Sequence, residues 1–238
     1  MGTLEPKAWH AQDGFSYRFD WGTSGVAALA DCAVLVIVDV LRFTTAVTVA
    51  AERNIAVTPA AGNSATEADQ SQLELSPAVI RASSTDHISL WSGNGAQVSL
   101  AAAAAGGTVI AASLRNASAA ARVAVARADH RPIGVIAAGE RWPDGTLRPA
   151  EEDLMGAGAV LRALDPGGSL TEPCCSPAAR AARAVFLDAE PLLLDLLTAT
   201  ASGRELWERG LGADVREAAR LDISDAVPVF DGHRFVAD

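Results

Sequence analysis

The sequence predicts an α/β protein, a three-layer α/β/α sandwich with a mixed, largely parallel central sheet. Two observations support this fold class. Short apolar runs alternate with longer helical patterns along most of the 238 residues, as in proteins built from strand–helix–strand units. In addition, residues 33–38 are apolar at every position and rich in β-branched side chains, which is typical of a strand buried on both faces.

The expected elements follow one another in a regular order. After the strand at 33–38, residues 44–53 are expected to form a helix, with Thr44 or Thr45 available as its N-cap. Further strands are expected at residues 55–58, 88–91, 108–112 and 134–138. Helices are expected at residues 96–105, 117–128 and 150–164, where the high helix propensity of alanine supports the pattern.

The C-terminal part of the chain is expected to be mostly helical. Residues 165–177 are rich in Gly, Pro and Ser and predict a surface loop. Helices are expected at residues 178–188, 191–202, 204–209 and 214–221, and Asp231-Gly232 between two apolar runs predicts a closing hairpin. We expect residues 1–238 to form a single domain, with the section 178–238 packed on the same unit.

Composition and charge exclude several classes of protein. Half of the residues are hydrophobic, which argues against a disordered chain. The net charge of −10 makes nucleic acid an unsuitable partner, because an acidic surface repels phosphates. No apolar run is long enough to predict a membrane span. Three cysteines and an N-terminus unlike a signal peptide predict a cytoplasmic protein with reduced thiols. Alanine-rich helical surfaces leave room for a homodimer.

Polar residues follow four of the predicted strands. In α/β sheets, ligands bind at the carboxyl ends of the strands, so these positions are the first candidates for a site. They are, in chain order, Asp39 with Arg42, the turn Ser92-Gly93-Asn94-Gly95, Ser113 with Asn116, and Glu140. The N–H groups of the glycine-rich turn, at the start of a helix, could hold an oxyanion.

Acidic residues also gather at the start of the helix at 150–164, where Glu151, Glu152 and Asp153 are consecutive. The helix macrodipole alone would explain them, and Asp39 could simply cap its own helix. Adjacent helical residues point about 100° apart, so we expect one of Glu152 and Asp153 to face the site and the other to cap or be solvated. Asp39 with Glu152 or Asp153 forms the predicted metal site, and oxygen-only ligands favour Mg²⁺ over zinc.

A competing pattern lies at Cys174, which is followed by Arg180 at the Cys-x5-Arg spacing of cysteine-based phosphatases. Such a site needs backbone N–H donors and an electropositive pocket. Pro173 and Pro177 flank the segment, the loop lacks glycine, and no strong strand leads into it. The pattern therefore ranks below the strand-end residues.

Several segments, in the same order along the chain, resemble blocks of the 2-phosphosulfolactate phosphatase (ComB-like) family. The matching blocks are residues 36–45, Ser76-Pro77, residues 92–95, 113–117, 152–158, 202–210 and 222–228. The sequence departs from the family pattern at Leu75, Ala96 and Gly156, where the family has Asn, Thr and Cys. The resemblance implies the α/β/α fold and a Mg²⁺-dependent phosphatase that releases phosphate from 2-phosphosulfolactate in coenzyme M biosynthesis.

We therefore expect hydrolysis of a small anionic phosphate monoester. In this hypothesis Asp39 and Arg42 have catalytic roles, and Glu140 is a candidate general acid or base. Substrate binding is expected from Ser76, Ser92, Asn94, Gly95, Ser113 and Asn116. Two alternatives stay open: an anion-binding protein of the same fold without catalysis, and a related phosphatase that acts on another phosphomonoester.

Overall fold

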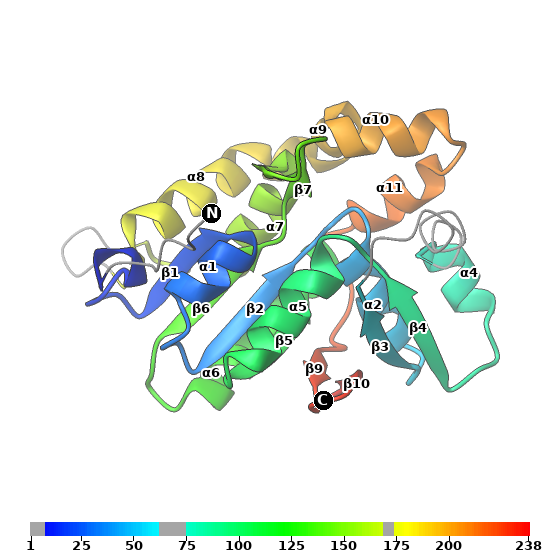
Figure 1. Ribbon diagram of the computed structural model, residues 1–238. Coiled ribbons are helices and arrows are strands. Elements are labelled where there is room, and N and C mark those ends of the chain that lie inside the picture. Colours follow the sequence, from blue (N-terminus) through cyan, green and yellow to red (C-terminus); the bar gives the residue numbers. More distant parts are fainter. Residues whose placement is uncertain (1–7, 62–74, 169–173) are drawn as a thin grey trace.

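The computed structural model of the chain describes residues 8–61, 75–168 and 174–238 and has the expected three-layer architecture (Figure 1). Its central sheet has eight strands. In spatial order they are β1 (Tyr17–Trp21), β6 (Ile133–Ala137), β2 (Val34–Val38), β5 (Thr108–Ala112), β9 (Pro228–Phe230), β10 (Phe235–Ala237), β3 (Ala56–Ala60) and β4 (His87–Trp91). All neighbouring pairs are parallel except those that involve β9 and β10. The sheet is thus mixed and largely parallel, which confirms the predicted fold class.

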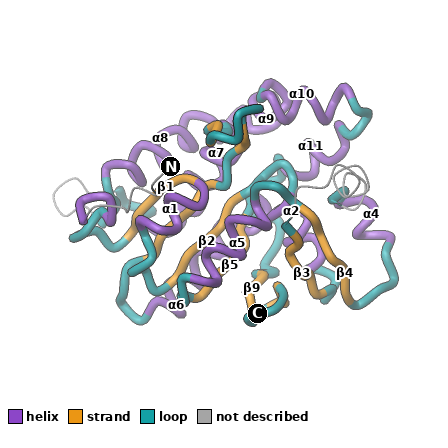
Figure 2. Tube along the Cα trace, viewed as in Figure 1, coloured by secondary structure: helices purple, strands orange, loops and turns teal. Residues whose placement is uncertain are grey.

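Helices cover both faces of the sheet, and Figure 2 shows the strands as a band between them. One face carries α1 (Gly22–Ala28), α2 (Phe43–Ala51), α4 (Pro77–Ala82) and α5 (Gly95–Ala104). The other carries α6 (Ala117–Ala128), α7 (Glu151–Leu164), α8 (Pro177–Ala189), α9 (Leu193–Ala199), α10 (Ala201–Glu208) and α11 (Gly212–Ala218). Short elements complete the described chain: the 3-10 turns Ala8–Ala11, Leu114–Asn116 and Glu190–Leu192, and the hairpin β7 (Glu140–Arg141) and β8 (Leu147–Arg148).

Strand β2 explains how one run of residues supports both layers. Val34, Val36 and Val38 pack into the core on one face, and Leu35 and Ile37 pack into the core on the other. This is the two-residue periodicity of a strand, and it requires apolar side chains at every position when both faces are covered. Among the helices that the structure describes, none is long and apolar enough to cross a membrane.

Most predicted elements are present, with shifts of one or two residues at their ends. Strand β5 and helix α6 have the predicted bounds, and the hairpin at Asp231-Gly232 is confirmed. The boundary between the helices expected at 191–202 and 204–209 was wrong. The helical run is instead interrupted at Thr200, between α9 and α10. The Thr200 hydroxyl accepts the N–H of Gly203 at 3.1 Å and so caps α10.

The loop expected at 165–177 is only partly a surface loop. Residues 169–173 lie outside the described residues. Cys175 and Ser176, however, are fully buried, because the backbone of Cys175 pairs with Tyr17 at the edge of β1. Strand β1 and helices α1 and α4 were not predicted.

Candidate active site

Three neighbouring parallel strands end at the same edge of the sheet. Val38, the last residue of β2, pairs with Ala112 of β5 and with Ala137 of β6. Asp39 and Ser113 therefore stand immediately beyond the same row of paired residues. This is the edge at which α/β proteins place their ligands.

Asp39 joins the starts of two helices. Its Oδ1 accepts the N–H of Phe43 at 3.0 Å, in α2, and its Oδ2 accepts the N–H of Gly95 at 2.9 Å, in α5. The predicted threonine cap is therefore wrong. Thr44 instead turns back, accepting the Asp39 N–H at 2.9 Å and donating to the Asp39 carbonyl at 2.8 Å. A carboxylate at two helix N-termini is favourably placed for both helix dipoles.

Gly95 is required by this arrangement. A Cβ at this position would lie 2.5 Å from Oδ2 of Asp39 and 2.6 Å from a ring carbon of Phe43, closer than side chains allow. The hydroxyl of Ser92 accepts the N–H of Asn94 at 3.2 Å and tightens the turn before α5. The glycine-rich turn thus directs the Gly95 N–H at the Asp39 carboxylate.

Asp153 connects α7 to two strand ends. Its Oδ1 accepts the N–H of Val40 at 2.7 Å, after β2, and its Oδ2 accepts the N–H of Gly139 at 2.9 Å, after β6. Asp153 is 3 % exposed and its neighbour Glu152 is 2 % exposed. The expectation that one of the two would cap or be solvated while the other faced the site is wrong. Asp153 accepts backbone N–H groups that follow β2 and β6, and Glu152 contacts Ser202 of α10, so both side chains are covered.

Glu152 and Glu140 share one hydroxyl group. Oε1 of each carboxylate contacts Oγ of Ser202, near the start of α10. A hydroxyl has a single proton, so both contacts are hydrogen bonds only when one of the two carboxyl groups is protonated. Oε2 of Glu140 accepts from Nη1 of Arg148 at 2.7 Å. Oε2 of Glu152 is buried without a hydrogen-bond partner among the residues that the structure describes.

The four acids, Asp39, Glu140, Glu152 and Asp153, are called the carboxylate cluster below. Burial raises the pKa of Asp39 to about 6, and the charge of Glu140 adds to this against the lowering effect of the Phe43 and Gly95 N–H groups. Burial, and then the charges of Asp39 and Glu152, raise the pKa of Asp153 well above its ordinary value. Burial also raises the pKa of Glu152, although the Ser202 hydroxyl opposes the change. The cluster therefore gathers more negative charge than its surroundings offset.

The donor set of this cluster fits a hard divalent cation. All donors are carboxylate oxygens, which Mg²⁺ prefers and which suit zinc less well. The unpartnered Oε2 of Glu152 is a buried acceptor that a cation would satisfy. Asp39 and Asp153 lie close enough for their charges to interact, whereas a metal site shared by Asp39 with Glu152 or Asp153 stays a prediction.

Arg42 belongs to a second buried group. Its Nη1 lies 2.6 Å from Oδ2 of Asp214, and Oδ1 of Asp214 accepts from the hydroxyl of Ser76 at 2.8 Å. Arg42 and Asp214 are both buried. The sequence did not indicate Asp214, because a buried arginine requires a partner but its position does not say which acid supplies it. The role of Arg42 and Ser76 toward a substrate stays a prediction.

Ser113 and Asn116 make a closed structural turn. Oδ1 of Asn116 accepts the N–H of Ser113 at 2.9 Å, and Nδ2 donates to the carbonyl of Ala226 at 3.0 Å. The Ser113 hydroxyl lies 3.3 Å from Oγ1 of Thr48. Both predicted residues are completely buried, and their part in substrate binding stays a prediction.

A cavity of about 180 Å³ opens beside the carboxylate cluster. Two of its lining residues, Glu140 and Asn94, were predicted as site residues. Thr23, Ser24 and Arg141 also line it and were not predicted. The hydroxyl groups come from the start of α1, which was itself not predicted. The cavity is therefore polar and has room for a small anionic ligand.

The fold is thus that of α/β proteins, which place their ligand sites at the carboxyl ends of parallel strands, where the carboxylate cluster lies. The chain matches the sequence model of 2-phosphosulpholactate phosphatase over residues 60–233. It belongs to this family, as its motifs predicted, and is accordingly a phosphatase of the phosphoric monoester hydrolase class. The matched part includes Glu140, Glu152 and Asp153, whereas Asp39 and Arg42 precede it. No curated protein shows a significant match to the chain.

Proposed function

We propose that this chain is a Mg²⁺-dependent phosphatase that hydrolyses 2-phosphosulfolactate to sulfolactate and phosphate. Membership of the family supports the phosphatase chemistry and the small anionic substrate. The observation that carries the metal dependence is the carboxylate cluster, in which buried acids converge without a matching number of cations. Burying such a group is costly unless a positive charge joins it.

Three residues of the cluster would hold the ion: Asp39, Glu152 and Asp153. Asp39 and Asp153 are fixed by two backbone N–H groups each, and Glu152 keeps one carboxylate oxygen available. When bound, Mg²⁺ would supply Lewis-acid stabilisation of the phosphoryl oxygens. The carboxylates would thus be held in place before the ion arrives, which limits the cost of ordering them.

Residues at the cavity would bind and protonate the substrate. Glu140 reaches both the cavity and Ser202, so it can exchange a proton with the ester as general acid or base. Arg148 fixes the orientation of the Glu140 carboxylate. Arg141 lines the same cavity and suits the second anionic group of the substrate. Arg42, held by Asp214, is proposed to contribute positive charge toward the phosphate.

The wider setting forms part of the same proposal. Apolar residues of the C-terminal helices, such as Leu206 and Val215, share the core of the central sheet, which supports a single folded unit for the chain. All three cysteines are free thiols, which suits a reducing cytoplasm. A homodimer stays a prediction.

The test is phosphate release from a panel of phosphomonoesters that includes 2-phosphosulfolactate, with and without Mg²⁺. We expect turnover that needs the ion and that falls on the order of 1,000-fold in Asp39→Asn. Circular dichroism of that variant should show a folded chain of lower stability, because asparagine keeps an acceptor oxygen for only one of the two helix starts that Asp39 joins.

Other outcomes would redirect the proposal. Turnover of a different ester alone would keep the phosphatase and change the substrate. The buried, apolar surroundings of Leu75 and Ala96, where the family has polar residues, give that outcome a physical basis. Calorimetric binding of sulfolactate without any turnover would indicate an anion-binding protein. Chelator-resistant turnover that is lost in Cys174→Ser would indicate a thiol phosphatase.

A further inference from the structure

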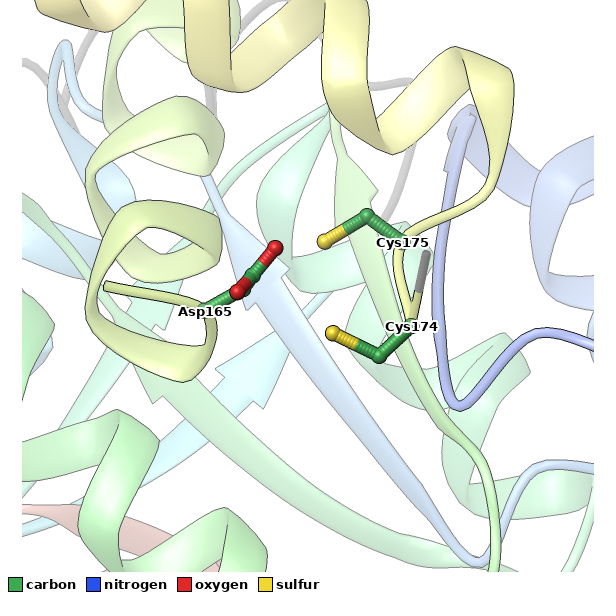
Figure 3. Close-up of side chains that lie close together, drawn as sticks. All are labelled: Asp165, Cys174 and Cys175. Carbon is green, nitrogen blue, oxygen red and sulfur yellow. The ribbon is translucent and has the colours of Figure 1, made fainter. Parts of the chain in front are cut away.

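A second set of metal-ligating side chains lies away from the carboxylate cluster. The Sγ atoms of Cys174 and Cys175 and one carboxylate oxygen of Asp165 all lie within 4.8 Å of one another. Figure 3 shows both thiols turned toward the Asp165 carboxylate. Asp165 follows α7, whereas the cysteines precede α8, so the fold brings the ligands together from two segments.

The backbone holds the two cysteines in place. The N–H of Tyr17 donates to the carbonyl of Cys174 at 2.9 Å, and the N–H of Ser176 donates to the carbonyl of Tyr17 at 2.9 Å. The pair is thereby anchored to the edge of β1. Cys175 is fully buried and Cys174 is partly exposed, so the position is both fixed and reachable from solvent.

The carboxylate is held independently of the thiols. Oδ1 of Asp165 accepts the N–H of Gly168 at 2.9 Å. Arg183 donates Nε to the backbone carbonyl of Asp165 at 3.1 Å, and its Nη2 donates to the carbonyl of Pro166 at 3.2 Å. The two Arg183 bonds use backbone carbonyls, and the Gly168 bond uses only Oδ1, so the Asp165 carboxylate can still accept hydrogen bonds from the thiols.

The surroundings favour a cation over a free thiolate. The Asp165 carboxylate places negative charge beside both thiols. The end of α7 adds the negative pole of a helix dipole. A nucleophilic cysteine needs the opposite environment. A bound cation would instead be stabilised by every one of these groups.

We propose that Asp165, Cys174 and Cys175 bind a Zn²⁺ ion through two thiolates and one carboxylate. Zinc–sulfur bonds are about 2.3 Å and zinc–oxygen bonds about 2.0–2.2 Å, so donors around one tetrahedral ion lie roughly 3.5–4 Å apart. Small side-chain rotations bring the three ligand atoms to that spacing. Both thiol protons pass to solvent on binding, and water takes the fourth position. Thiolates exclude Mg²⁺ as the preferred ion.

This site is independent of the proposed phosphatase site. Glu152 lies in the first turn of α7 and Asp165 follows its last residue. The helix has 14 residues, so about 20 Å of helix separate them at 1.5 Å per residue. A zinc ion here would join the end of α7, the edge of β1 and the start of α8, and would therefore stabilise the fold.

Cobalt substitution tests the proposal on the reduced, full-length chain. Co²⁺ should produce a thiolate-to-metal charge-transfer band, and one equivalent of Zn²⁺ should abolish it. We expect Cys174→Ser and Asp165→Asn to weaken Zn²⁺ binding, measured by competition with a chromophoric chelator, on the order of 100-fold or more. Both variants are expected to fold, since Cys174 is partly exposed and asparagine keeps the oxygen that accepts from Gly168.

Two controls separate this site from the rest of the molecule. Cys32→Ser removes the third cysteine, which is buried elsewhere, and should keep the charge-transfer band. Glu152→Gln should also keep the band, while Cys174→Ser should keep any Mg²⁺-dependent phosphatase activity. The proposal is overturned if the reduced chain gives no such band, or if Cys174→Ser or Asp165→Asn binds Zn²⁺ as tightly as the parent chain.

Discussion

Two groups of acids in this chain, each at least partly buried, have opposite balances of charge. In the carboxylate cluster, four acids face one arginine, Arg148. In a second group, here called the arginine cluster, Arg81 and Arg115 each pair with both Glu52 and Glu217. Arg220 also pairs with Glu217, so cations at least match anions in the arginine cluster, whereas negative charge is in excess in the carboxylate cluster.

The pKa of Glu217 and the pKa values of Asp39 and Asp153 shift in opposite directions. Burial alone would raise the pKa of Glu217, but Arg115 and Arg81 outweigh it and lower the pKa. Among the residues that the structure describes, no comparable cation offsets burial at Asp39 or Asp153, and their pKa values rise. The difference teaches that burial of acids is not itself a sign of function. Burial of acids without matching cations is such a sign, because it costs the folded chain free energy that a bound cation can offset.

The largest expected effects come from exchanging one acid in each group for its amide. Glu152→Gln should lower Mg²⁺-dependent turnover on the order of 100-fold, because it removes charge from the proposed metal site. Its free energy of unfolding without divalent ions should be unchanged or higher, because repulsion falls. Glu217→Gln should keep its turnover and lose about 1–3 kcal/mol of stability, because Arg115 and Arg81 lose a charged partner.

Phosphate release and urea unfolding of both variants check this pair. The comparison fails if Glu152→Gln is as active as the parent chain, or if Glu217→Gln is the less active of the two.

A smaller effect is expected from adding a single methyl group beside Asp39. Gly95→Ala would place a Cβ 2.5 Å from Oδ2 of Asp39 and displace the carboxylate. We expect kcat to fall about 10- to 100-fold, since small misplacements of catalytic groups are costly. Gly93→Ala is the matched control, because its Cβ would lie no closer than 3.5 Å to any neighbour, an atom of Trp91. Steady-state kinetics showing equal losses in both variants would remove the special role of Gly95.

The smallest expected effect is the pH dependence of stability in the metal-free chain. The folded pKa of Asp39 is about 6, above the ordinary aspartate value of about 3.9. The folded state therefore binds more protons between these values, and stability falls as the pH rises through this window. Lowering the pH from about 7 to about 5 should raise the free energy of unfolding by about 1–3 kcal/mol.

Urea unfolding in the presence of a chelator measures this change, and Asp39→Asn should show a smaller one. Glu217 acts with the opposite sign, because its pKa is lowered and its contribution is lost only under more acidic conditions. If the free energy of unfolding changes between pH 7 and pH 5 by the same amount in the parent chain and in Asp39→Asn, Asp39 does not titrate as described.

The sequence predicted the parts of the fold that depend on local patterns. The apolar run of β2 and the alanine-rich helix α6 are such patterns, and both were located within a residue. Strand β1 escaped prediction because Arg18 and Asp20 interrupt its apolar residues at an edge position of the sheet. Local pattern also misjudged the segment around Cys175, whose burial depends on pairing with a strand distant in sequence.

The candidate site was predictable in outline, because parallel strands in register must end together. That argument places Asp39 beside Ser113, whereas the approach of Asp153 also needs the start of α7 to pack against the strand ends. Asp214 and Ser202 could not be predicted, since each reaches its partner through the packing of C-terminal helices. Nothing local in the sequence encodes that Asp214 meets Arg42 across 172 positions.

The hairpin of β9 and β10 has a consequence for how the chain is made. The parallel pair β3–β4 meets the remainder of the sheet only through β10, and β9 in turn meets β5. During synthesis, β3 and β4 emerge long before residues 228–237. One flank of β3 therefore stays unpaired until residues 235–237 have been synthesised.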